Sequence, residues 1–155
     1  PCLRPRARLL HGVDISVPML QLAREKNVYD YLSRTDLGEA ITFPEGRFDI
    51  AVCADVLVYF GALEPPLRNL HRALNPGGWL LFTVEDAARL APAAGYTLQP
   101  SGRHAHSEGY IRDRLAECGF LRPRIVLHDV LRHEYQQPIA CLAVAAQKPA
   151  IFRSG

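Results

Sequence analysis

The feature of this sequence that most constrains its fold is a regular alternation of apolar, strand-like runs with amphipathic, helix-like runs. Four strands are predicted at residues 9–13, 31–34, 48–54 and 79–84, and three helices at 18–28, 63–74 and 107–118. The run 48–54 is almost entirely apolar, so we expect a central parallel strand buried on both faces. This alternation predicts an α/β protein built as a three-layer sandwich.

The C-terminal part breaks the alternation. The apolar runs 125–131 and 139–146 have no helix between them, which predicts an antiparallel pair. Upstream, Pro76-Gly77-Gly78 ends the helix before it abruptly. We therefore expect a mostly parallel, Rossmann-like sheet that ends in an antiparallel hairpin. One domain would span residues 1–148, followed by a tail at 149–155.

Composition excludes several classes of function. Hydrophobic residues make up 48% and charged residues 22%, with a net charge of +2, which is typical of a soluble globular domain. The arginines are scattered, which argues against a nucleic-acid interface, and no apolar run approaches the roughly 20 residues of a membrane span. Neither the cysteine spacing nor the histidine spacing suits a metal site or a disulfide framework. Reduced thiols and a cytoplasmic location are expected. The residues concerned are Cys2, Cys53, Cys118, Cys141, His104, His106, His128 and His133.

The run from Gly12 to Leu20 carries the first functional signal. Asp14 ends a predicted strand, Ser16 is a good N-cap, and Pro18 suits the first turn of the helix that follows. An acid at the carboxyl end of a strand, just before a helix, is placed to accept hydrogen bonds from ribose hydroxyls. Aspartates also end strands as simple turn or capping residues, so both interpretations of Asp14 stay open.

Three segments together resemble class I S-adenosylmethionine-dependent methyltransferases. Residues 12–20 resemble the second motif of that family, residues 48–60 its fourth strand and following loop, and residues 73–82 the Pro-Gly-Gly turn and fifth strand. Residues 95–107 are similar to bacterial predicted methyltransferases that often carry tetratricopeptide repeats. The resemblance covers residues 9–148 and implies methyl transfer from S-adenosylmethionine to a small-molecule nucleophile.

The resemblance also implies a set of cofactor contacts. Asp14 would bind the ribose, Asp36 would accept from the adenine amino group, and the pocket for the methyl donor would lie at the carboxyl ends of the strands. Asp36 could equally be a turn residue, and Met19 could be a core residue. The full set of predicted cofactor-binding residues is Asp14, Ile15, Met19, Asp36, Leu37, Cys53 and Ala54.

The candidate catalytic residues are those expected to lie near the methyl acceptor, on what is called the acceptor side of the site below. Asp55 follows the fourth strand, and His104 and His106 lie in a predicted loop rich in Gly, Ser and Pro, where substrate contacts are common. Glu85 is a further candidate proton acceptor. Asp55 could instead cap the next helix, and the histidines could be surface or capping residues. The fourth strand ends without the [DN]-P-P-[YF] motif of enzymes that methylate bases or amides, which favours a small-molecule acceptor.

One motif of the resembled family is not found in this sequence. The family's glycine-rich loop follows the first strand, upstream of the residue that corresponds to Asp14, and holds the methionine part of the cofactor. With that strand and loop missing, we expect a gap in the sheet, weak cofactor binding and a tendency to self-associate. A catalytically silent binding or regulatory partner is the main alternative. A nicotinamide-dependent enzyme would share the strand-ending acid but explains neither the Pro-Gly-Gly turn nor the final hairpin.

Overall fold

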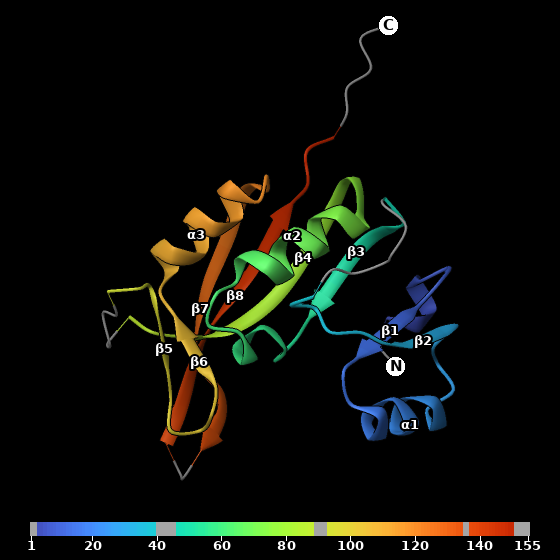
Figure 1. Ribbon diagram of the computed structural model, residues 1–155, viewed down its shortest axis with the longest axis horizontal. Helices are drawn as coiled ribbons and strands as arrows, with labels where there is room; N and C mark the ends of the chain where they lie inside the picture. The colour runs from blue at the N-terminus through green and yellow to red at the C-terminus, as the bar shows by residue number, and fades with distance from the viewer. Residues whose placement is uncertain (1–2, 40–45, 89–92, 135–136, 151–155) are drawn as a thin grey trace, which may run out of the picture. The chain divides into compact units, whose positions relative to one another are not determined.

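The computed structural model describes residues 3–39, 46–88, 93–134 and 137–150, in two compact units, Pro1–Ile41 and Thr42–Gly155. They are called unit 1 and unit 2 below, and each is described by itself (Figure 1). Cys2 and residues 151–155 of the predicted tail lie outside the described residues. Within the described ranges, no helix has the length and apolarity needed to cross a bilayer.

Unit 1 is a strand–helix–strand unit preceded by the short 3-10 helix η1 (Arg4–Arg6). The strands β1 (His11–Asp14) and β2 (Tyr31–Arg34) pair in parallel, and the helix α1 (Val17–Glu25) connects them. The predicted cap of α1 is confirmed, because the Ser16 hydroxyl accepts the Met19 backbone N–H at 3.4 Å. The helix is shorter than predicted: it ends at Glu25, and Asn27 follows in the left-handed region at φ 48°.

Unit 2 contains a six-stranded mixed sheet centred on β4. Along one side of β4 runs β8 in antiparallel register, and β8 pairs in turn with β7, which confirms the predicted terminal hairpin. Along the other side lie first β3 and then β6, both parallel to β4, with β5 antiparallel to β6. The strands are β3 (Phe48–Cys53), β4 (Leu74–Asp86), β5 (Tyr96–Leu98), β6 (His104–His106), β7 (Leu121–Glu134) and β8 (Gln137–Gln147).

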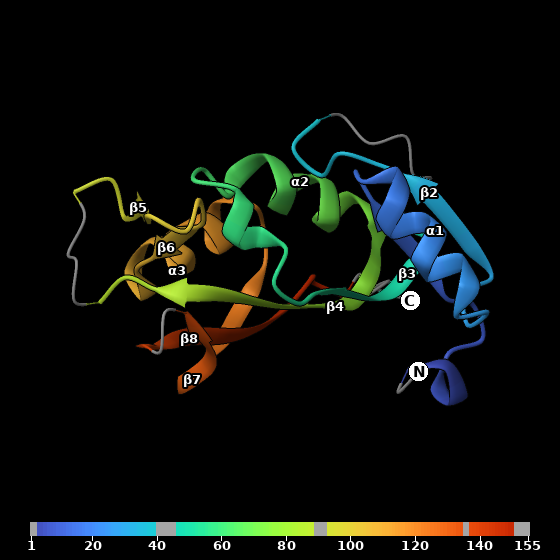
Figure 2. The same cartoon turned by 90° about the horizontal axis from the view of Figure 1, so that it is seen from below.

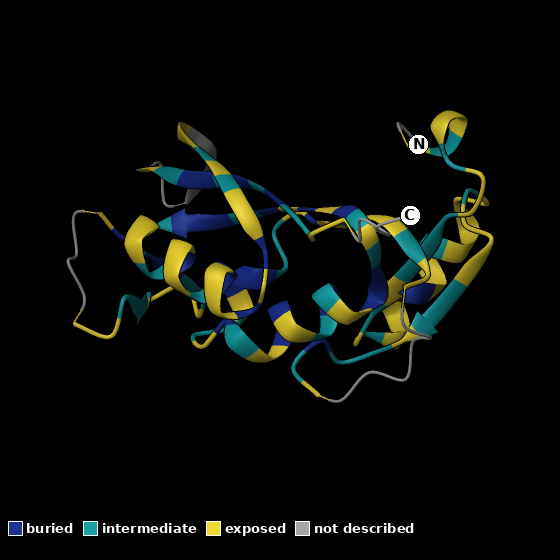
Figure 3. Ribbon diagram, turned by 90° about the horizontal axis from the view of Figure 1, so that it is seen from above, coloured by how far each residue is buried: buried dark blue, intermediate teal, exposed yellow. Residues whose placement is uncertain are grey.

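The core of unit 2 lies on one face of this sheet. The helices α2 (Glu64–Ala73) and α3 (Glu108–Glu117) contact each other, with α2 along β4 and α3 along β7 (Figure 2). Each helix alternates between buried and exposed positions (Figure 3), and its apolar side chains face the sheet. The fully buried large side chains include Leu57, Leu63, Leu67, Leu74, Leu80, Ile111 and Leu115. The described part of unit 2 therefore consists of a sheet with helices on one face.

The prediction that the strand 48–54 is buried on both faces is wrong. Ile50 and Val52 are 58% and 47% exposed, whereas Cys53 is 5% exposed. Successive side chains of a strand point to opposite faces, and in unit 2 the helices cover only one of them. Trp79 and Leu81 on the neighbouring strand β4 are exposed for the same reason.

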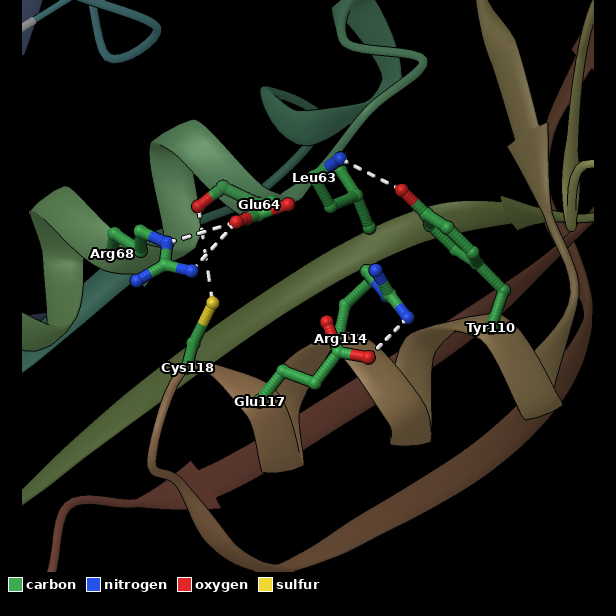
Figure 4. Close-up of polar contacts among 7 residues, drawn as sticks. All are labelled: Leu63, Glu64, Arg68, Tyr110, Arg114, Glu117 and Cys118. Carbon is green, nitrogen blue, oxygen red and sulfur yellow. Dashed lines mark hydrogen bonds and ion pairs between the residues drawn. The ribbon is translucent and has the colours of Figure 1, made fainter.

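Polar contacts join the start of α2 to α3 (Figure 4). The Tyr110 hydroxyl accepts the Leu63 backbone N–H at 3.0 Å, and the Cys118 thiol donates to the Glu64 carbonyl at 3.8 Å. The predicted cap of α3 is confirmed, since the Ser107 hydroxyl accepts the Tyr110 N–H. These contacts fix the segment that enters α2 against α3.

Candidate active site

Two carboxylates stand at the same edge of unit 1, where its parallel strands end. Asp14 is the last residue of β1, and its Oδ1 accepts the Ser16 N–H at 2.8 Å. Asp36 follows β2, and its Oδ1 accepts the Gly38 N–H at 2.8 Å. Both residues are therefore turn aspartates, but no described residue donates a hydrogen bond to Oδ2 of either one. The remaining oxygens are available for hydroxyl or amino donors, so these residues fit the adenosine part of a nucleoside cofactor.

Apolar side chains border Asp14 on the same unit. Ile15 and Met19 are 55% and 52% exposed, so Met19 is not a core residue of unit 1. Leu37, in contrast, is buried at 8% exposure, so its side chain is a core group of unit 1. Apolar side chains with exposed surface next to a carboxylate suit a ligand with a flat apolar ring and a polar sugar.

Asp55 in unit 2 occupies a gap between two strands. The strand β3 pairs with β4 as far as Phe82, and β6 joins the same side of β4 only at Glu85. Opposite this gap, the Thr83 hydroxyl accepts the Asp55 backbone N–H at 3.0 Å. Asp55 itself is held in the left-handed region at φ 56°, a conformation that is uncommon for residues other than glycine. Such strain persists only where surrounding contacts enforce it, and it is concentrated at functional sites.

An arginine and a tyrosine lie beside Asp55. Nη2 of Arg103 is 3.5 Å from Asp55 Oδ2 and also 3.5 Å from the Tyr59 hydroxyl. The guanidinium carbon lies 5.7 Å from the centre of the Tyr59 ring. Tyr59 is 59% exposed, so this cluster opens to solvent. At this distance and exposure the ion pair contributes little to stability, typically about 0–1 kcal/mol.

The other predicted residues at the strand ends have different surroundings. Burial raises the pKa of the Cys53 thiol to about 12, so this cysteine is a neutral apolar group rather than a nucleophile. Ala54 is exposed at the end of β3. Glu85 is almost fully buried at 4% exposure, in the part of β4 that pairs with both β6 and β8.

The two histidines lie on a strand, not in the loop predicted from the sequence. His104 and His106 are the first and last residues of β6, which pairs with β4 and β5. The flanking Gly, Ser and Pro residues suggested a loop, and a three-residue strand gives no periodic signal. His106 is fully buried, and burial lowers its pKa to about 4. Among the described residues, neither His104 Nδ1 nor His106 Nδ1 has a hydrogen-bond partner.

Comparison with known proteins identifies the family. A family described as a methyltransferase domain matches residues 2–82, just over half of the sequence and most of the elements described above. The chain belongs to this methyltransferase family. The predicted class, with S-adenosylmethionine as methyl donor, is thereby confirmed; the subtype associated with tetratricopeptide repeats stays a prediction.

Two relatives of this methyltransferase domain carry the same name, malonyl-[acyl-carrier protein] O-methyltransferase. That of Salmonella typhimurium is 30% identical over 108 residues, which is 70% of this chain and 42% of the relative. That of Legionella pneumophila is 28% identical over 157 residues, which is 94% of this chain and 53% of the relative. The chain thus spans about half the length of these curated relatives.

A solved structure confirms the fold. A SAM-dependent methyltransferase of Methanosarcina mazei superposes with a TM-score of 0.72 at 17% identity, over 96% of this chain and 86% of that one. At this identity the likeness shows the methyltransferase fold alone.

Three residues of the cluster around Asp55 were not predicted from the sequence as site residues: Tyr59, Thr83 and Arg103. Thr83 meets Asp55 across 28 positions of sequence, a contact for which the sequence gives no signal. Arg103 directly precedes His104, which was predicted as a site residue, and both lie in a segment rich in Gly and Ser. This position was the signal in the sequence that could have pointed to Arg103. Asp55, one of the predicted catalytic residues, lies 3.5 Å from Arg103 and donates its backbone N–H to the Thr83 hydroxyl.

Proposed function

We propose that this methyltransferase domain transfers the methyl group of S-adenosylmethionine to an oxygen atom of a small acid. The observation that carries the proposal is Asp14, which ends β1 inside the matched segment with one carboxylate oxygen unused by described residues. The name shared by the two relatives, malonyl-[acyl-carrier protein] O-methyltransferase, supports an oxygen acceptor on an acidic acyl group.

Unit 1 supplies the groups for the adenosine end of the cofactor. Asp14 would accept hydrogen bonds from the ribose hydroxyls and Asp36 from the adenine amino group, and Ile15 and Met19 would pack against adenosine. When bound, S-adenosylmethionine supplies a methyl group on a positively charged sulfur, which is already strongly electrophilic. The protein therefore has to bind, orient and desolvate the reactants rather than activate the donor.

In unit 2, the solvent-exposed cluster of Asp55, Tyr59 and Arg103 would face the methyl acceptor, and Arg103 supplies a positive charge there. Arg103, beside Tyr59 and Asp55, is suited to an anionic acceptor, because a guanidinium binds carboxylate groups with charge-assisted hydrogen bonds. A carboxylate is ionised at neutral pH and needs no proton removed before methylation. A hydroxyl acceptor would instead need a base, for which Asp55 and His104 are the candidates. The pH dependence of methyl transfer consequently distinguishes the two kinds of acceptor.

The test uses S-adenosylmethionine labelled in the methyl group, with a malonyl thioester as acceptor. We expect label in an ester product, a rate that is nearly constant from pH 6 to 8, and loss of labelling in Asp14→Asn. A rate that rises through this pH range would indicate a hydroxyl acceptor and a general base. Absence of label with any small acid, from a protein that binds S-adenosylhomocysteine, would support the catalytically silent alternative and overturn the proposal.

A further inference from the structure

We propose that His106 is a positioning residue, which together with Tyr110 clamps residues 60–63 and so fixes the acceptor-side cluster of Asp55, Tyr59 and Arg103. This inference rests on the proposed function for the meaning of that cluster. It gives His106 a role other than the proton acceptor predicted from the sequence. The geometry around its ring carries the argument.

The proton of the His106 ring is assigned by its hydrogen bonds. Nε2 lies 2.9 Å from the Phe60 carbonyl oxygen and 3.1 Å from the Gly61 carbonyl oxygen. Carbonyl oxygens only accept hydrogen bonds, so Nε2 carries the hydrogen and donates it. The basic lone pair is then on Nδ1, which is buried. A fully buried lone pair is badly placed to take a proton from an acceptor at the solvent-facing rim.

Tyr110 completes the clamp from α3. Its ring stacks on His106 with centroids 5.9 Å apart and planes at 25°, and its hydroxyl accepts the Leu63 backbone N–H (Figure 4). Between these two anchors, Gly61 passes so close to Tyr96 that a Cβ atom would lie 2.6 Å from that ring. The segment is thus held at Phe60, Gly61 and Leu63 by side chains of β5, β6 and α3.

The clamped segment connects the two sides of the acceptor cluster. It follows directly after η2 (Leu57–Tyr59), so holding Phe60 and Gly61 also fixes the backbone that carries Tyr59. Arg103 directly precedes β6, the strand that carries His106. One buried ring therefore sets the distance between Tyr59 and Arg103, the two side chains that meet beside Asp55.

The surroundings of His106 favour its neutral form. Burial disfavours a charge on the ring. Among the described titratable groups, Tyr96 from β5, His104 from β6 and Tyr110 from α3 are in ring contact with it, and Asp86 is its register partner on β4. A protonated ring would place a second N–H at Nδ1, where no described residue offers an acceptor. A ring that stays neutral above about pH 4 can hold the two carbonyls throughout the pH range in which methyl transfer would be measured.

Enzyme kinetics separate positioning from proton transfer. His106→Gln keeps an N–H donor of similar reach but cannot act as a base, whereas His106→Leu removes the donor. We expect His106→Gln to retain kcat and the pH profile within about threefold, and His106→Leu and Tyr110→Phe to lower kcat/KM for the acceptor by about tenfold or more. In all three, affinity for S-adenosylhomocysteine should stay within about twofold of the parent. His128→Gln, at an exposed position of β7, is the matched control. Equal loss of kcat in the Gln and Leu variants, with a changed pH profile, would overturn the positioning role.

Nuclear magnetic resonance tests the clamp without any turnover. In the full chain we expect the His106 ring to be protonated at Nε2 and unprotonated at Nδ1 throughout pH 5.5–8, and the Leu63 amide to exchange slowly. Tyr110→Phe should accelerate Leu63 exchange. A ring that titrates in this range, or a Leu63 amide indifferent to Tyr110→Phe, would overturn the clamp even in an active enzyme. The expected signals without methylation of any acid would uphold the clamp and contradict the proposed function instead.

Discussion

Acid should destabilise unit 2 through one buried side chain, His106. The ring is fully buried, and its pKa falls from an ordinary value of 6.5 to about 4 in the folded protein, with burial as the largest cause. Above pH 6.5 the ring is neutral in both the folded and the unfolded chain, so its titration does not affect stability. As the pH falls from 6.5 towards 4, the unfolded chain takes up a proton that the folded chain excludes, and stability is lost.

The size of this effect follows from the pKa difference. Each pH unit between the two pKa values lowers the free energy of unfolding by about 1.4 kcal/mol, and the whole interval amounts to roughly 3 kcal/mol. Below pH 4 both states are protonated and this contribution levels off. A loss of this size is a large fraction of the typical stability of a domain.

Trp79 provides the assay. It is the only tryptophan of the chain and lies in β4, so its fluorescence reports the unfolding of unit 2. Urea titrations at pH values from 7 to 4 give the free energy of unfolding for the parent, for His106→Gln and for the control His128→Gln. The carboxylates and the histidines other than His106 and His128 are common to all three proteins, so their contributions cancel in the comparison.

The parent and His128→Gln should show the steeper loss of stability, and His106→Gln the shallower one. The difference should open between pH 6.5 and 4, where the His106 ring is neutral in the folded state and charged in the unfolded state. Parallel curves for all three proteins would refute the reasoning, because they would mean that His106 titrates in the folded chain as it does in water.

Three further changes have definite expected outcomes. Asp14→Ala should abolish binding of S-adenosylhomocysteine, and unchanged affinity in calorimetry would refute the ribose role. Thr83→Val leaves the Asp55 N–H without its acceptor and should lower kcat/KM about tenfold, whereas Thr83→Ser keeps the hydroxyl and should stay close to the parent. Equal kcat/KM values for the Val and Ser variants would show that the hydroxyl is dispensable. Gly61→Ala places a Cβ atom 2.6 Å from the Tyr96 ring and should lower the free energy of unfolding by about 1–3 kcal/mol; a stability equal to the parent's would show that Tyr96 can move aside.

Helix caps and helix ends depend on a few neighbouring residues, and the sequence predicted several of them correctly. Ser16 and Ser107 cap their helices as expected, and α2 ends at Ala73 just before the Asn-Pro-Gly-Gly run. The parallel pairing of unit 1 and the antiparallel terminal hairpin are also confirmed. Caps, glycines and apolar periodicity act over a few residues, so a single sequence is enough to predict them.

What the sequence did not predict depends on contacts between distant segments. Ile50 and Val52 are exposed because the helices of unit 2 cover the opposite face of the sheet. Which face the helices cover depends on how the whole unit packs, and the sequence of the strand alone does not show it. The placement of His106 under Phe60 and Gly61 joins residues about 45 positions apart, and so does the approach of Arg103 to Tyr59. The candidate site was therefore predicted as separate residues, and the cluster of Asp55, Tyr59 and Arg103 was assembled only by the fold.

The central claim is that the chain carries the adenosine-binding elements of a methyltransferase, and a titration of S-adenosylhomocysteine into the chain by calorimetry tests it most directly. The account predicts saturable binding for which adenosine competes, because Asp14 and Asp36 each present, at one edge of unit 1, a carboxylate oxygen to which no described residue donates. No detectable heat, together with no shift of the backbone amide signals of residues 14–19 and 36–38, would contradict it.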